Sequence, residues 1–176
     1  MLMEILLVLI LIFTLLFIAT ALVSLVLRVP YVPTKKRVML EIIKQADLKE
    51  GQTFLDLGCG DGRMLIEAEK ATKVNAIGYE IAPLVYILAI ARKLLTGSKA
   101  KIKFKNFFKE NLEKADVIFC YLMPAELEKL AKKIKLECKK GTRIISNTFH
   151  IKGLEPFKII PKNEKTKIPT LYFYEV

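Results

Sequence analysis

The stretch that most constrains the fold of this chain runs from Phe54 to Arg63 and reads FLDLGCGDGR. Its apolar beginning predicts a buried strand, with the carboxylate of Asp56 near the carboxyl end of that strand. Gly58, Gly60 and Gly62 follow at a spacing of two, which lets the backbone turn sharply and approach a ligand closely. A helix that begins near Gly62 would point its free amide groups at the same ligand. The stretch therefore predicts a ligand-binding loop between a strand and a helix of an open α/β sheet.

Glycine loops of this kind occur in several nucleotide-binding folds, so spacing has to distinguish them. The dinucleotide fingerprint G-x-G-x-x-G would place glycine or alanine at position 63, where this chain has Arg63, and no G-K-S/T follows as a P-loop would require. The next predicted strand ends in Glu80, 24 positions after Asp56, about where a ribose-binding carboxylate is expected. The pairing of a G-x-G-x-G loop with Glu80 is the observation that discriminates between these classes.

On these residues the chain resembles the class I S-adenosylmethionine-dependent methyltransferases, with DLGCGDG as their first motif and Glu80 as the acid that binds both ribose hydroxyls. More narrowly, it is similar to the short protein-lysine methyltransferases that include the mitochondrial enzyme for the ATP synthase c subunit and its archaeal relatives. The similarity covers roughly residues 29–155 and rests on VPYVPT at 29–34, DLGCGDGR at 56–63, GYE at 78–80, ADVIFCYLMP at 115–124 and GTRIISNTF at 141–149.

The resemblance implies S-adenosyl-L-methionine as the cofactor. It implies cofactor contacts from Tyr31, Asp56, Gly58, Cys59, Gly60, Gly62, Glu80, Ile81, Asn106 and Phe107. The segment 31–34 would fold over the methionine end, and Asn106 would accept a hydrogen bond from the adenine amino group. Plainer interpretations stay open, because Tyr31 could simply pack in a turn and Asn106 could simply form one.

The fourth predicted strand ends in Tyr121, followed by Leu-Met-Pro. Methyltransferases directed at amino groups of nucleic-acid bases usually carry Asn or Asp, two prolines and an aromatic residue there, so the absence of that motif argues against a base-modifying enzyme. Tyr121 and Asn147, at the end of the fifth predicted strand, are the candidates for orienting an acceptor amine. His150 follows Asn147, and both a structural and a functional role stay open for it.

The hydrophobic pattern from residue 53 alternates strands with helices, which predicts a Rossmann-like, doubly wound α/β sheet that is mostly parallel. Its predicted strands are 53–57, 74–79, 101–105, 116–121 and 142–147, and its helices are 62–71, 82–95 and one from Pro124. A helix at 35–46, capped by Thr34, precedes them. The last quarter predicts an antiparallel hairpin, and no helix is evident between 148 and 156.

An uncharged apolar run from Ile5 to Leu27 predicts one transmembrane helix before this domain. As a helix it would be about 34 Å long, enough for a bilayer core of about 30 Å. A signal peptide would begin with basic residues and have a shorter apolar run, and a soluble core helix rarely stays apolar on every face. We therefore expect a membrane anchor at 1–28 and a methyltransferase domain at 29–176.

Basic residues follow the apolar run, with Arg28, Lys35, Lys36 and Arg37 after it and only Glu4 before it. The positive-inside rule then places the catalytic domain in the cytoplasm of a single-pass membrane protein. Three cysteines without paired or metal-ligand spacing are expected to be reduced thiols there, and no metal site is expected.

All 29 Lys and Arg residues but only 17 of the 18 acidic residues follow residue 27, so this part carries a net charge of +12. An anionic membrane surface is the expected partner, at about 1 kcal/mol per basic residue close to it. Nucleic acid and a merely solvated lysine face are the alternatives. Lys99, Lys101, Lys103 and Lys105 alternate in the third predicted strand, as is typical of an edge strand protected from pairing.

These features predict a membrane-anchored S-adenosylmethionine-dependent methyltransferase that modifies lysine side chains of a membrane-associated protein. Two other functions stay open. One is methylation of a lipid or isoprenoid small molecule, which a membrane anchor would also favour. The other is a protein that binds S-adenosylmethionine without catalysing a reaction.

Overall fold

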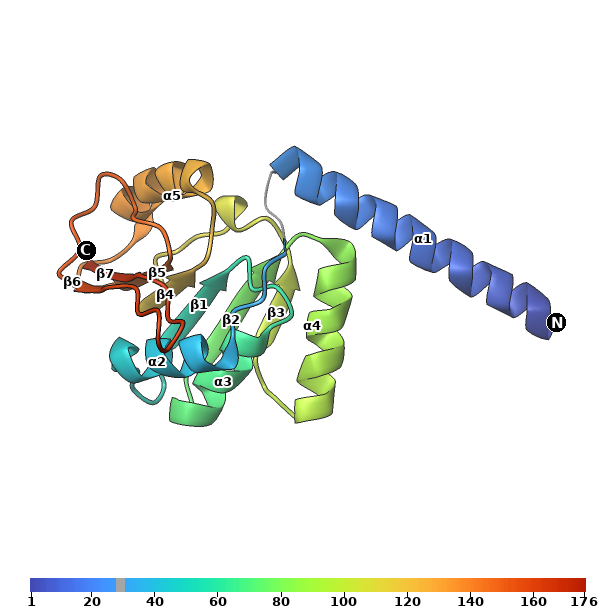
Figure 1. The fold of residues 1–176 in the computed structure, drawn as a ribbon, viewed down its shortest axis with the longest axis horizontal. Coiled ribbons are helices and arrows are strands. Elements are labelled where there is room, and N and C mark those ends of the chain that lie inside the picture. The colour runs from blue at the N-terminus through green and yellow to red at the C-terminus, as the bar shows by residue number, and fades with distance from the viewer. Residues whose placement is uncertain (28–30) are drawn as a thin grey trace.

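The computed structural model, which describes residues 1–27 and 31–176, consists of a long N-terminal helix and an α/β domain (Figure 1). Every strand and helix predicted from residue 35 onward is present, with boundaries within one residue of those expected. In chain order the elements are α1 (Leu2–Leu27), α2 (Lys36–Ala46), β1 (Thr53–Leu57), α3 (Arg63–Thr72), β2 (Asn75–Glu80), α4 (Pro83–Thr96), β3 (Lys101–Phe104), the 3-10 helix η1 (Phe107–Lys109), β4 (Val117–Cys120), α5 (Pro124–Glu137), β5 (Arg143–Asn147), β6 (Lys158–Ile160) and β7 (Leu171–Glu175).

The seven strands form one sheet in the order β3-β2-β1-β4-β5-β7-β6. Strands β1 to β5 pair in parallel, whereas β7 pairs antiparallel with both β5 and β6. This confirms the Rossmann-like sheet with an antiparallel C-terminal hairpin. The chain proceeds outward from β1 to β2 and β3 on one side and to β4 and β5 on the other. The carboxyl ends of β1 and β4 therefore flank the point where α/β sheets of this kind bind ligands.

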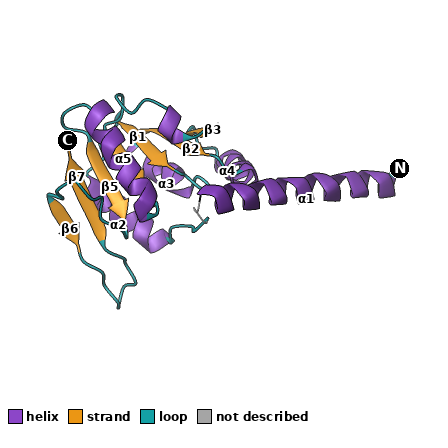
Figure 2. Ribbon diagram, turned by 90° about the horizontal axis from the view of Figure 1, so that it is seen from above, coloured by secondary structure: helices purple, strands orange, loops and turns teal. Residues whose placement is uncertain are grey.

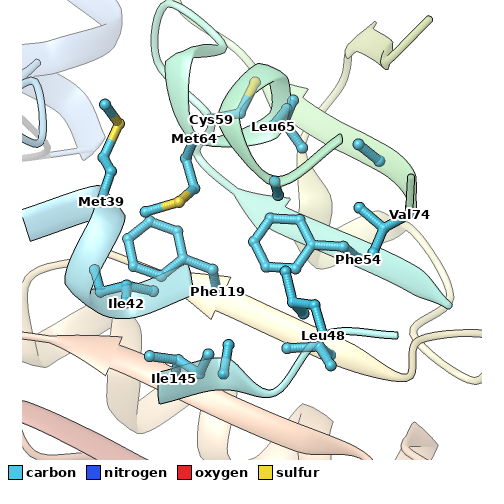
Figure 3. Close-up of a cluster of buried hydrophobic side chains, with 14 of the residues drawn as sticks. Met39, Ile42, Leu48, Phe54, Cys59, Met64, Leu65, Val74, Phe119 and Ile145 are labelled. Atoms are coloured by element: carbon cyan, nitrogen blue, oxygen red, sulfur yellow. The ribbon is translucent and has the colours of Figure 1, made fainter. Parts of the chain in front are cut away.

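Two hydrophobic clusters cover the two faces of the sheet. On one face, side chains of α2, α3 and α4 pack against strand residues such as Phe54 and Phe119 (Figure 3). On the other face, α5 contributes Leu127, Leu130, Ala131 and Ile134, the four residues that the sequence pattern placed inward. Residues 148–156, all of them described, contain no helix, as predicted. Ile151 and Leu154 of that loop pack beside α5 in place of the helix.

The start of α2 differs from the prediction. The residue before the helix is Lys35, with φ −66° and ψ 145°, and within the described residues no side chain caps this end. The Lys35 carbonyl accepts hydrogen bonds from the backbone N–H of Val38 and Met39 at 2.9 and 3.1 Å. The predicted Thr34 cap is wrong because Thr34 lies one residue too early and its own carbonyl accepts a hydrogen bond from Arg63, at 3.3 Å.

Strand β3 lies at the edge of the sheet, as the alternating lysines predicted. Lys101 is exposed, and the Lys103 ammonium lies 5.5 Å from the centre of the Tyr79 ring. Ile102 is buried, but Phe104, which continues the same alternation, is half exposed and packs against the Tyr86 ring of α4 at 5.2 Å. The edge is thus bordered by α4 as well as by lysines.

Helix α1 extends away from the domain and exposes its apolar side chains (Figures 1 and 2). Within Leu2–Leu25, a stretch of 18 residues has a mean hydropathy of 3.1, so the helix is long and apolar enough to cross a bilayer. Near its carboxyl end it contacts α4, where the Thr20 hydroxyl accepts a hydrogen bond from the backbone N–H of Leu84 at 2.9 Å. The predicted domain boundary at 28 and 29, including Arg28, lies outside the described residues.

Candidate active site

A cavity of about 360 Å³ lies at the carboxyl ends of β1, β2 and β4. It brings together most of the residues predicted as the site, namely Tyr31, Asp56, Gly58, Cys59, Gly60, Glu80, Ile81, Asn106, Phe107 and Tyr121. Gly62 and Asn147 are the two predicted site residues that are not part of its lining. The cavity also includes residues that the sequence pattern did not single out, among them Asp61, Glu126, Phe149 and two residues of α1.

The glycine loop turns through the left-handed region of the backbone. Gly60 has φ +57°, and a Cβ built there would lie 3.0 Å from the ring of Tyr31, so the glycine allows the tyrosine to cover the loop. Gly62 has φ +74° and precedes α3, where a Cβ would meet Ile102 at 3.0 Å. Gly62 therefore contributes by turning the chain into α3, which is why it lies outside the lining.

The Glu80 carboxylate joins two loops. One oxygen accepts the Gly60 N–H at 2.9 Å, and the other accepts the N–H groups of Ile81 and Ala82, both at 2.8 Å. Burial raises the pKa of Glu80 above its usual value, although these three hydrogen bonds act in the opposite direction. The carboxylate thus fixes the glycine loop against the turn between β2 and α4. About one acceptor position remains for a ligand, on the oxygen that accepts from Gly60, since each carboxylate oxygen has about two.

Asp56 is buried beneath the same loop. Burial first, and then the charges of Glu80 and Asp61, hold the pKa of its carboxyl well above the usual range. Within residues 1–27 and 31–176 no hydrogen bond to this carboxylate is found. Three carboxylates therefore converge at one part of the cavity, and a cationic ligand would relieve their mutual repulsion.

Asp61 is held by two arginines. It accepts hydrogen bonds from Arg63 Nε at 2.8 Å and from a terminal nitrogen of Arg92 at 2.7 Å, and its side chain is only 4% exposed. Burial by itself would raise the pKa of Asp61, but the hydrogen bond and charge of Arg63 and the charge of Arg92 outweigh it and lower the pKa. This network is not predictable from the sequence, because Arg92 lies on α4, 31 residues after Asp61, and no local pattern connects the two residues.

Arg63 also holds the segment 31–34 over the loop. One of its terminal nitrogens donates to the Thr34 carbonyl at 3.3 Å while the others bind Asp61. Tyr31, at the start of that segment, lies against Gly60, and burial together with the nearby Asp61 carboxylate raises the pKa of its hydroxyl. Arg63, which departs from the dinucleotide fingerprint, thus has a structural role here. It connects the glycine loop to the segment 31–34.

Asn106 both lines the cavity and forms a turn. Its side-chain oxygen accepts the N–H of Phe108 at 3.0 Å, at the start of η1. Phe107 lines the cavity beside it and packs on Phe108, with ring centres 4.3 Å apart. The turn-forming interpretation of Asn106 therefore holds, and its contact with a cofactor stays a prediction.

The remaining walls come from β4, α5 and α1. Tyr121 follows β4, and Glu126, in the first turn of α5, has a side chain only 13% exposed that pairs with Lys129 at 3.2 Å. Val23 and Ser24 of α1 complete this side. An acid in the first turn of a helix usually indicates only a favourable charge at the helix N-terminus, so the sequence held no distinct signal for Glu126.

Two candidates from the end of β5 lie elsewhere. Asn147 is buried, and its side-chain oxygen accepts the Thr148 hydroxyl at 3.1 Å, so its role in orienting an amine stays a prediction without a place in the lining. His150 is exposed and lies edge-on to Tyr172, with ring centres 5.5 Å apart. The cysteines Cys59, Cys120 and Cys138 are free thiols.

Comparison with known proteins identifies relatives that match most of the chain. Residues 56–158 match the ANTKMT methyltransferase domain. A protein-lysine N-methyltransferase of Saccharolobus islandicus is 35% identical, over 87% of this chain and 97% of that protein. The adenine nucleotide translocase lysine N-methyltransferase of Mus musculus is 29% identical, over 78% of this chain and 61% of its own length, so this chain spans less than two thirds of it. Lysine N-methyltransferases of the ATP synthase c subunit, from Rattus norvegicus and Homo sapiens, also match, as the resemblance implied.

The fold also matches solved structures. The crystal structure of an RNA methyltransferase from Salinibacter ruber in complex with S-adenosyl-L-homocysteine is 26% identical, with a TM-score of 0.77. The match covers 82% of this chain and 94% of that one. The expected class of cofactor is thereby confirmed, because the matched protein binds the demethylated form of S-adenosyl-L-methionine.

The first prediction concerns Asp61. We expect Asp61→Asn to lower the free energy of unfolding at pH 7 by about 1–3 kcal/mol, because it leaves the partly buried Arg63 and the more exposed Arg92 without their carboxylate. Since the folded-state pKa of Asp61 is lowered, its stabilising contribution is present above pH 4 and is lost as the pH falls below that. The difference in free energy of unfolding between the parent chain and Asp61→Asn should therefore become smaller as the pH is lowered from 7 to 3.

Thermal and urea unfolding of the full chain in detergent micelles would measure this deficit. Glu128→Gln is the matched control, because its ion pair with Lys152 is exposed on both sides and should contribute little. A deficit for Asp61→Asn that is no larger than that of the control, or that is the same at pH 7 and pH 3, would contradict the assigned network.

Proposed function

Since this chain belongs to the ANTKMT methyltransferase domain family, we propose that it methylates lysine side chains of a membrane-associated protein while α1 anchors it in the membrane. It is a class I S-adenosylmethionine-dependent methyltransferase, and S-adenosyl-L-methionine is its cofactor. The observation that carries the proposal is the composition of the cavity, which combines the glycine loop and Glu80 with Val23 and Ser24 of α1. An apolar helix of membrane-spanning length thus forms part of the site where an acceptor would meet the cofactor.

The residues of the cavity fit this cofactor. Its sulfonium and amino groups are cationic, and a cation beside Asp56 and Glu80 favours the charged form of these two carboxyls, whose pKa values burial raises. A volume of about 360 Å³ lies in the range of small-molecule sites.

Each part of the cofactor has a proposed partner. We assign the ribose to Glu80 and the methionine part to Asp56 and the loop Gly58–Gly60, with Tyr31 over it. We assign the adenine to Asn106 and Phe107. Cys59 and Ile81, which line the cavity, flank the ribose and loop positions, and Gly62 acts through the turn into α3.

Bound S-adenosyl-L-methionine supplies a methyl group that a nucleophile takes by in-line displacement. The main contribution of the protein is therefore alignment, which supplies about 7–11 kcal/mol in well-oriented reactions. A lysine acceptor must lose its proton, and from a pKa of about 10.4 this costs about 4.6 kcal/mol at pH 7. Burial of the amine beside aromatic walls such as Phe149, and beside a cation, lowers that pKa. A general base is then not required, and we assign Tyr121 the role of orienting the amine.

The charge of the chain supports the membrane part of the proposal. Lys35, Lys36 and Arg37 follow α1, and the residues after position 27 carry a net charge of +12. This polarity favours a single-pass protein whose catalytic domain faces the cytoplasm and lies against anionic headgroups. The relatives named for protein-lysine methylation support a protein acceptor. The membrane-side wall of the cavity supports an acceptor that is itself at the membrane.

Cofactor binding by the full chain gives the second prediction. We expect Glu80→Gln to weaken binding of S-adenosyl-L-homocysteine about tenfold or more, because an amide keeps the size of the carboxylate but removes its charge. Binding to the parent chain should weaken as the pH falls from 7.5 to 5, because burial raises the pKa of Asp56 and Glu80 and protonation removes the charges that attract the ligand.

Isothermal titration calorimetry in detergent measures both effects, and Glu128→Gln serves as the control with an exposed carboxylate. Glu80→Gln should also show a shallower dependence on pH. Equal affinity of the parent and the Glu80→Gln chain would remove Glu80 from the cofactor site.

The acceptor class gives the third prediction. Incubation of the purified chain with methyl-labelled S-adenosyl-L-methionine and host membranes should place the label on lysine residues of a membrane protein, located by mass spectrometry. A Glu80→Ala chain should give no label. Label in solvent-extractable lipid would instead support the lipid or isoprenoid acceptor, and label in RNA a nucleic-acid acceptor. Cofactor binding without label in any fraction would support a non-catalytic binding protein.

Tyr121 gives the fourth prediction. We expect Tyr121→Phe to lower the turnover number about tenfold while the affinity for S-adenosyl-L-homocysteine stays within about twofold, because the hydroxyl would position the amine and not the cofactor. Asn147→Ala, measured in parallel, tests the predicted residue that lies outside the lining. Full turnover by Tyr121→Phe would leave Tyr121 as a wall of the cavity without a positioning role.

A further inference from the structure

Helix α4 carries apolar side chains on two faces. Val85 and Ala89 are buried against the sheet. The opposite side, which we call the outer face of α4, carries apolar residues at the spacing of successive helical turns: Leu84, Ile87, Leu88, Ala91, Leu94 and Leu95. Leu94 and Leu95 are 73% and 88% exposed, and Ile87 and Leu88 are 44% and 48% exposed. A helix with only one apolar face would suffice to cover the sheet. Packing against the sheet therefore does not account for the apolar residues of the outer face.

The outer face is continuous with α1. The hydrogen bond from the Leu84 N–H to the Thr20 hydroxyl joins the first turn of α4 to α1 at 2.9 Å. The two helices lie side by side there in both views (Figures 1 and 2). From this junction α1 continues as an exposed apolar helix in one direction, and the exposed leucines of α4 continue in another. Whatever apolar medium surrounds α1 therefore begins next to the outer face of α4.

Positive charge borders the outer face. Lys93 lies in the last turn of α4, and Lys99 follows in the loop between α4 and β3. An exposed apolar stripe with lysines along its border is the composition of a helix that lies in the plane of an anionic membrane surface.

We propose that the outer face of α4 is a second membrane-contact surface, which inserts between the headgroups and acyl chains of an anionic bilayer beside α1. Lys93 and Lys99, at the end of α4 and in the loop after it, then contact the headgroups. The domain is held at two places, and the cavity, whose wall includes Val23 and Ser24, is kept next to the lipid surface. The proposal rests on α1 spanning the membrane, as proposed above, and adds the surface that orients the domain on it.

Depth-dependent quenching in vesicles tests this surface. The full chain with Cys138→Ser, which removes the one cysteine that is not buried, receives a single new cysteine for an environment-sensitive fluorophore. Leu95→Cys probes the outer face, and Leu136→Cys, 84% exposed on α5, is the matched control. Leu9→Cys in α1 reports whether the anchor is inserted. The vesicles contain phosphatidylglycerol and phosphatidylcholine with shallow or deep nitroxide-labelled lipids.

We expect shallow nitroxide lipids to quench the label at position 95 at least about twice as strongly as the label at 136, and deep ones to quench the label at 9. If the label at position 9 is quenched but the labels at 95 and 136 are quenched equally, α1 is inserted and the outer face of α4 is not. That result would overturn this proposal but not the proposed anchor. Absence of quenching of the label at position 9 would overturn both the proposed α1 anchor and the proposed membrane contact of α4.

Discussion

The Glu80 carboxylate is the interaction on which the arrangement of the site depends. Through three backbone N–H groups it joins the loop after β1 to the turn after β2, and Ala82, one of its donors, is the residue that precedes α4. Two residues further on, the Leu84 N–H binds Thr20 of α1. A short path of hydrogen bonds therefore connects the glycine loop, the start of α4 and the membrane-length helix, so their positions depend on one another.

Charge is separated within the molecule. The residues after position 27 carry a net charge of +12, yet Asp56, Asp61 and Glu80 concentrate negative charge in the buried cavity. Arg63 and Arg92 neutralise Asp61 but do not bond to the other two carboxylates. The cavity is thereby suited to a cationic nucleoside, whereas the basic exterior is suited to an anionic surface. If the exterior binds an anionic surface as proposed, opposite charges at the two places keep that partner and the cofactor from competing.

The helices and strands were predictable because the signals that determine them, such as hydrophobic periodicity, lie within a few residues of one another along the chain. The strand and helix boundaries follow from hydrophobic periodicity and from prolines and glycines, and the loop at 58–62 and Glu80 follow from spacing along the chain. Contacts between distant segments were not predictable in this way. Arg92 reaches Asp61 from another helix, and Arg63 donates a hydrogen bond to the distant Thr34 carbonyl. Asn147 ends β5 as expected, but Thr148, with φ +75°, turns the chain after it and binds its side chain.

The hydroxyl of Thr20 has a consequence for the acceptor. Because it caps the first turn of α4, α1 cannot slide or rotate relative to the domain without breaking that bond. If α1 spans a bilayer, the height of the cavity above the hydrocarbon is then a fixed property of the enzyme. Selection among lysines would follow from their elevation along the membrane normal, in the manner of a ruler, so that a short surface loop at the right level is a better target than an accessible lysine far out in the aqueous phase.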